Sequence, residues 1–142
     1  MEYLYEKLKA FSPVSVVEKN LNGAEGYYSK KSKQIVIDNT SETNHKTSVL
    51  LHELTHCLYD DFDYSKNRDL SEVFVESVAY IVADYFGLDT SSCSFKYITS
   101  WAKGDVKTVI DLGTKIQKTA NAFINKIEKF ELQDIENIEL VA

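Results

Sequence analysis

The alternation of apolar and polar positions predicts one short helix and a few short strands near the N-terminus. The helix covers roughly Glu2 to Phe11 and ends before Pro13, because the residue preceding a proline disfavours helical backbone. A strand is predicted at Val14 to Glu18. Two more strands, at Gly26 to Tyr28 and Gln34 to Asp38, flank a polar loop and are predicted to form a β-hairpin.

From about Ser41 the apolar spacing becomes helical, and one long helix is predicted. Thr40 or Ser41 can cap its N-terminus. The apolar positions of this helix share one face, which we expect to be buried: Leu50, Leu51, Leu54, Cys57 and Leu58. A polar, acidic loop from Asp60 to Arg68 follows the helix.

Helical patterns continue along the rest of the chain. Further helices are predicted from Asp69 or Ser71 to Gly87, from Ser94 to Lys103 and from Val106 to Lys129. Gly87 is a natural left-handed stop for the first of them. Residues 131–142 hold four acidic residues and no basic one, so we expect a loose tail there. A small early sheet, expected to be antiparallel, followed by helices gives the α+β class.

The helix beginning near Ser41 contains His52-Glu53-Leu54-Thr55-His56, the pattern HExxH. Residues four apart are separated by about 40° around a helix, so both imidazoles project toward one point. Glu53 lies about 100° from His52, beside the two rings. A metal ion can then take two neutral nitrogens while a carboxylate lies over its bound water. The apolar face of this helix lies opposite the histidines, which leaves their side free to form a site. The alternative is that His52 and His56 are two surface histidines.

Zinc needs a third protein ligand and an open position for water. The next helix offers Glu72 and Glu76 on one stripe, which Ala79 and Ala83 continue with side chains small enough for close helix packing. Glu76 lies twenty residues after His56, which resembles the spacing in the glutamate zincins, and this resemblance implies that Glu76 is the third ligand. Glu72 would then hold a histidine Nδ1–H or the edge of the site, although one helical turn is all that separates the two roles. The alternative is a solvent-exposed acidic face.

Several other residues are candidates for the same site. His45 lies two turns before His52, too far along the helix to bind the same ion, so it either borders the site or is a surface residue of the first helical turn. An aspartate of the helix-exit loop could replace the glutamate as ligand: Asp60, Asp61 or Asp63. A phenol could stabilise an oxyanion, with core or rim packing as the alternative use of each candidate: Tyr59, Tyr80 and Tyr97.

Length and composition favour one ordinary globular domain. The chain has 142 residues, the common size of a single domain, so we expect one domain over residues 1–142. No apolar run approaches the ~20 residues that a membrane span needs. The N-terminal residues include acids where a signal peptide has a basic region. We therefore expect a cytoplasmic protein without a membrane partner.

Charge and cysteine content exclude two further classes. The net charge is −6 and Arg68 is the one arginine, which argues against nucleic-acid binding by this chain alone. Cys57 and Cys93 form no CxxC pair and are too few for a disulfide-stabilised secreted domain, so we expect both to be reduced.

The motifs resemble the zincin-type metallopeptidase domain of ArdC-like antirestriction proteins, which occur on bacterial plasmids, phages and conjugative elements. The resemblance covers residues 26–125 and rests on four segments in order: GYYSKKSKQIVID at 26–38, LLHELTHCL at 50–58, SEVFVESVAYIVADYFGLDTS at 71–91 and SFKYITSWAKG at 94–104. The chain is more loosely similar to the ImmA/IrrE metallopeptidases, which share HExxH followed by an ExxA helix, here Glu76 to Ala79.

The resemblance implies a zincin fold and a Zn²⁺ site formed by His52, His56 and a glutamate of the following helix, with Glu53 as the catalytic base. We therefore predict a zinc-dependent metallopeptidase that acts on a protein or peptide. We also expect the strand Gln34 to Asp38 to align an extended peptide by edge pairing. The alternative is a catalytically silent zincin-fold module that binds a partner protein. No pattern in the sequence names a substrate or an oligomeric state.

Overall fold

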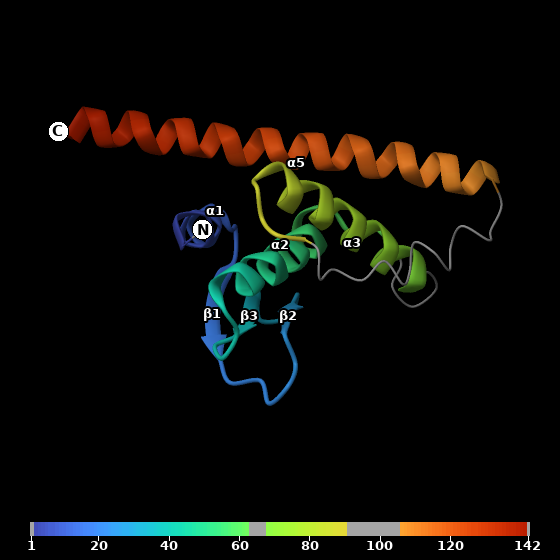
Figure 1. The fold of residues 1–142 in the computed structure, drawn as a ribbon, viewed down its shortest axis with the longest axis horizontal. Coiled ribbons are helices and arrows are strands. Elements are labelled where there is room, and N and C mark those ends of the chain that lie inside the picture. The colour runs from blue at the N-terminus through green and yellow to red at the C-terminus, as the bar shows by residue number, and fades with distance from the viewer. Residues whose placement is uncertain (1, 63–67, 91–105, 142) are drawn as a thin grey trace.

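A computed structural model describes residues 2–62, 68–90 and 106–141 (Figure 1). In chain order its elements are α1 (Glu2–Phe11), β1 (Ser15–Lys19), β2 (Gly26–Ser29), β3 (Gln34–Asp38), α2 (Thr43–Tyr59), α3 (Arg68–Tyr85) and α5 (Val106–Val141). The described part is therefore α+β, as the sequence predicted, with a three-stranded sheet. The helix expected over Ser94 to Lys103 lies outside the described residues.

The sheet is mixed, not antiparallel as expected. Its strand order is β1-β3-β2; β2 pairs with β3 in the predicted antiparallel hairpin, whereas β1 pairs with β3 in parallel. The central place suits β3 because Ile35, Val36 and Ile37 are all fully buried there. The expectation that β3 pairs with an extended peptide is therefore wrong, since both of its edges are occupied. Within the described sheet, β2 is the edge strand beside α2.

The start of α2 differs from the expected cap. Glu42 occupies the N-cap position and its side chain makes no capping hydrogen bond. Thr40 and Ser41, the expected caps, instead donate their hydroxyl hydrogen bonds to the Asp38 carboxylate at the end of β3. These bonds, with a third from the Leu21 amide, lower the pKa of Asp38 and fix the turn from β3 into α2.

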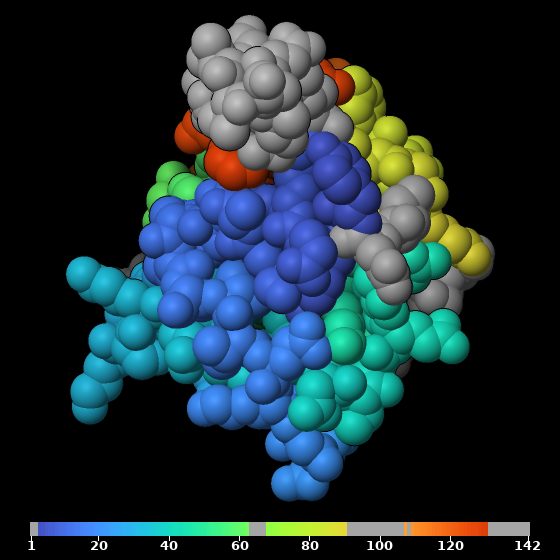
Figure 2. Space-filling view, turned by 90° about the vertical axis from the view of Figure 1, so that its left-hand side faces the viewer, coloured from blue at the N-terminus to red at the C-terminus, as the bar shows by residue number. Residues whose placement is uncertain are grey.

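The helices pack in layers on the sheet. In Figure 1, α2 lies between the sheet and α3, and α5 crosses on the far side; α2 contacts β2, β3, α1 and α3, while α5 contacts α3 and α1. Figure 2 looks onto the α1 and β1 side, where α1 lies below α5. The predicted apolar face of α2 is confirmed at its centre, because Leu50, Leu51 and Leu54 are fully buried. At its C-terminal end, Cys57 and Leu58 are only partly buried.

The C-terminal helix is longer than predicted. The loose tail expected over residues 131–142 is helical through Val141. The acidic composition suggested a tail, but Leu132, Ile135 and Ile138 keep a three-residue apolar spacing that continues the helical pattern. No helix among the described residues is long and apolar enough to cross a membrane.

Candidate metal centre

The HExxH residues form a compact group on one face of α2. His52, Glu53 and His56 each offer a ligating atom, and these atoms all lie within 4.8 Å of one another. The two imidazole rings have centroids 4.9 Å apart, as one helical turn between them requires. These three residues could therefore hold a metal ion, as the sequence predicted.

Glu72 of α3 brings its carboxylate to both histidines. One of its oxygens, Oε2, lies 3.6 Å from Nε2 of His52, and the other, Oε1, lies 3.3 Å from Nε2 of His56. Both imidazoles thus direct the same ring nitrogen toward one carboxylate. The side chains are only 14–29% exposed, so water screens these contacts weakly.

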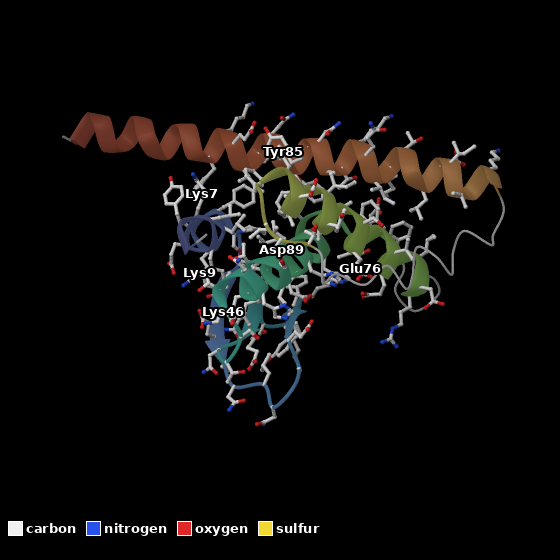
Figure 3. All side chains as sticks on the ribbon, viewed as in Figure 1. Lys7, Lys9, Lys46, Glu76, Tyr85 and Asp89 are labelled. Atoms are coloured by element: carbon white, nitrogen blue, oxygen red, sulfur yellow. The ribbon has the colours of Figure 1, made fainter. Side chains whose placement is uncertain are left out.

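Glu76, the glutamate that the sequence favoured as third ligand, lies one turn further along α3 (Figure 3). Among the described ion pairs, the histidines of the motif contact Glu72 and Asp60. Burial raises the pKa of Glu76 above its ordinary value, and the nearby His52 opposes that rise. Its role as the metal ligand stays a prediction.

Asp60, the first residue after α2, holds the other side of the His56 ring. Its Oδ2 lies 2.8 Å from His56 Nδ1 and accepts a 2.7 Å hydrogen bond from the Ser71 hydroxyl. Its Oδ1 accepts a hydrogen bond from the Phe62 amide at 3.2 Å. We expected Glu72 to hold a histidine Nδ1–H or the edge of the site, but the residue that contacts Nδ1 of His56 is Asp60.

The charges of the group are strongly coupled. Burial raises the pKa of Glu53, which is 7% exposed, and the two histidines oppose the rise. Burial lowers the pKa of His56, but hydrogen bonds to Glu72 and Asp60 outweigh that effect and raise it. Hydrogen bonds from His52 and His56 hold the pKa of Glu72 far below its ordinary value. Glu72 is therefore an ionised carboxylate, whereas Glu53 binds a proton more readily than an exposed glutamate.

A cavity of about 560 Å³ opens beside the group. Its lining comes from β2 and the turn after it, from α2, from the chain that follows α2 and from α3: Gly26, Tyr27, Tyr28, Lys30, His52, Glu53, His56, Asp60, Phe62 and Glu72. The β2 residues, Lys30 and Phe62 were not among the site residues predicted from the sequence. The packing of β2 against α2 brings the β2 residues there, whereas Phe62 lies in the chain that follows α2 and packs on Phe74 of α3.

The other candidate residues have different surroundings. His45 is exposed and its Nε2 lies 3.0 Å from Glu25 Oε1, away from the cavity lining. The Tyr59 ring packs 5.3 Å from that of Phe123, and its buried hydroxyl has no hydrogen-bond partner among the described residues. Tyr59 is therefore a packing residue. Asp61 contacts Lys115 of α5, Tyr80 is absent from the cavity lining, and Tyr97 and Asp63 lie outside the described residues.

The chain is similar to a known protein whose function is not described. No protein-family model and no solved structure matches the chain. It is similar to a protein of Bacillus anthracis described as uncharacterized, with 34% identity over 100 residues that make up 68% of this chain. The matched region is 17% of that protein's length, so this chain corresponds to a small part of its relative.

Proposed function

We propose that this chain is a zinc-dependent metallopeptidase of the zincin type found on mobile genetic elements, as its resemblance to ArdC-like proteins implies. One observation carries the proposal. The Nε2 atoms of His52 and His56 face the Glu72 carboxylate, and Glu53 lies beside them at an open cavity.

The donor set fits zinc. Two imidazole nitrogens and one carboxylate oxygen are a ligand set of zinc hydrolases, which keep a further position for water. We assign these ligands to His52, His56 and Glu72, with Glu76 as the alternative that the sequence favoured. When bound, zinc would lower the pKa of a water molecule and polarise a substrate carbonyl.

Glu53 supplies the acid–base chemistry. Its carboxylate lies next to the histidines on the cavity wall, so it accepts a proton from water during attack and later passes it to the leaving amine. Burial raises the pKa of Glu53 toward neutral pH. A pKa nearer the working pH allows the carboxylate both to accept a proton and to release it.

Strand β2 supplies the alignment of the substrate. It is an edge strand of the described sheet and its residues Gly26, Tyr27 and Tyr28 line the cavity. An extended peptide pairing with this edge would lie alongside the histidines, with its main chain rather than its side chains making most hydrogen bonds. We therefore propose that β2, not β3 as first expected, aligns the peptide substrate.

The test replaces Glu53→Gln and measures zinc content and peptide hydrolysis together. We expect about one zinc per chain to remain while the hydrolysis rate falls by a factor on the order of 10² to 10⁴, the usual contribution of a general base. The charge-matched control is Glu42→Gln, because Glu42 is an exposed glutamate at the start of the same helix. This variant should hydrolyse peptide at the wild-type rate.

Unchanged hydrolysis in Glu53→Gln would refute this mechanism. Wild-type protein that binds zinc but hydrolyses no peptide would instead favour the silent binding module. Absence of zinc binding by the wild-type protein would refute both the proposed enzyme activity and the proposed metal site.

A further inference from the structure

We infer that Asp60 is a positioning residue that orients His56 so that its Nε2 faces the metal position. This inference rests on the proposed function. Asp60 Oδ2 lies 2.8 Å from Nδ1, whereas Glu72 Oε1 lies 3.3 Å from Nε2, so the two carboxylates are on opposite edges of one imidazole. A carboxylate oxygen accepts hydrogen bonds, so we assign Nδ1–H of His56 as the donor to Asp60 Oδ2. With Nδ1 held by Asp60, Nε2, which faces the Glu72 carboxylate, is the ring nitrogen that would bind a metal in place of its proton.

Asp60 is itself held in place by two further donors. The Ser71 hydroxyl donates to the same Oδ2 at 2.7 Å and the Phe62 amide donates to Oδ1 at 3.2 Å. Ser71 is fully buried and the Asp60 side chain is only 10% exposed. The carboxylate therefore has little freedom to rotate away from the histidine.

The same contact links the two helices that supply the proposed ligands. Asp60 follows the last turn of α2, which carries His56, and Ser71 directly precedes Glu72 on α3. A hydrogen bond from Ser71 to Asp60 thus fixes the end of α2 against the first turn of α3. Asp60 accordingly sets both the direction of the His56 ring and its separation from the Glu72 carboxylate.

An amide at this position cannot replace the carboxylate. Asp60→Asn with its nitrogen toward His56 would present a donor to Nδ1 and favour the tautomer with a proton on Nε2. Turned the other way, its nitrogen would meet the Phe62 amide, which is also a donor. Either orientation removes one of the contacts that hold the ring.

The experiment measures zinc affinity by competition with a chromophoric chelator, and the visible spectrum of the Co²⁺-loaded protein. For Asp60→Asn we expect zinc affinity to fall about 10- to 100-fold and the cobalt bands to change, as removal of a hydrogen-bond partner of a metal-bound histidine typically does. The control is Asp61→Asn, which removes the same charge one residue along. Its carboxylate is 72% exposed and contacts Lys115, so both readouts should match wild type.

Circular dichroism of the metal-free proteins separates this effect from misfolding. If Asp60→Asn does not fold, Ser71→Ala is measured instead, and we expect a smaller loss of affinity with the same direction of spectral change. Wild-type affinity and an unchanged cobalt spectrum in the folded variant would overturn the role of Asp60 alone. No zinc binding by wild type would overturn the proposed function, and this role with it.

Discussion

Glu72 and Glu76 lie one helical turn apart on α3, but we expect only Glu72 to be required for zinc binding. The Glu72 oxygens lie 3.6 and 3.3 Å from the two Nε2 atoms, so Glu72→Gln should lose bound zinc. Glu76→Gln should retain about one zinc per chain. Elemental mass spectrometry after dialysis measures both, and loss of zinc in Glu76→Gln alone would restore Glu76 as the ligand.

Gly26 shows how little space separates β2 from its neighbours. A Cβ atom there would lie 2.7 Å from Val49 Cγ1 on α2 and 2.9 Å from the Val36 carbonyl oxygen on β3. Because the backbone oxygen cannot move aside easily, Gly26→Ala should destabilise the fold by about 1–3 kcal/mol, the usual cost of overpacking. Urea unfolding followed by circular dichroism measures the change.

Gly113 is the matched control for this substitution. It lies inside α5, and an added Cβ would meet nothing within 4 Å. Gly113→Ala should therefore stabilise the protein by roughly 0.5–1 kcal/mol, because alanine loses less backbone entropy in a helix. Equal effects of the two substitutions would show that β2 does not approach α2 so closely.

Among the secondary-structure elements, the Glu18 carboxylate links β1 to α1 and α2 by hydrogen bonds. Glu18 on β1 accepts hydrogen bonds from the Tyr5 hydroxyl of α1 and from Lys46 of α2, each at 2.8 Å (Figure 3 labels Lys46). Tyr5→Phe removes one of these bonds, and at pH 7 we expect a loss of about 1 kcal/mol in the free energy of unfolding. Urea unfolding of both proteins gives the difference.

The loss should depend on pH. The Lys46 hydrogen bond, the largest cause, and the Tyr5 hydrogen bond lower the pKa of folded Glu18 below 4.5, while partial burial opposes them. A lowered folded pKa means that the stabilisation is present above the unfolded value and disappears as pH falls through the folded value. The difference between wild type and Tyr5→Phe should therefore be smaller at pH 3 than at pH 7. Tyr27→Phe, at a 46% exposed tyrosine, should show no such dependence.

At the scale of the whole molecule, α5 covers the hydrophobic core and packs against α3 and α1. Phe123 on α5 is fully buried, and its ring lies 6.1 Å from that of Phe11 on α1 and 5.3 Å from that of Tyr59 at the end of α2. Phe123→Ala should therefore cost about 3–5 kcal/mol, a large part of the stability of a domain this size. Ile110→Ala, at a 61% exposed position on the same helix, should change stability by less than about 0.5 kcal/mol. Thermal unfolding compares the two, and similar midpoints would mean that α5 does not pack on the body.

The histidine pair and the β-hairpin were predictable because both depend on residues close in sequence. A spacing of four places His52 and His56 on one side of any α-helix, whatever surrounds it. The hairpin from Gly26 to Asp38 likewise follows from two short strands joined by a polar turn.

The partners of the histidines were not predictable in this way. Whether Glu72 or Glu76 faces the histidines depends on how α3 is rotated about its axis and shifted along α2. Many buried side chains of both helices set that arrangement together. Asp60 was one of three loop aspartates considered as a metal ligand, but nothing in its sequence neighbourhood indicates that Ser71 donates a hydrogen bond to it.

The sequence by itself determined the α+β class, most of the elements, and the group of His52, Glu53 and His56, since local periodicity dictates each of them. Tertiary structure alone decided that β3 is central, that β2 lines the cavity, that Glu72 faces both histidines and that Asp60 contacts His56. These features depend on contacts between elements distant in the chain. Such contacts are selected by the burial of whole faces, so no short sequence pattern specifies them.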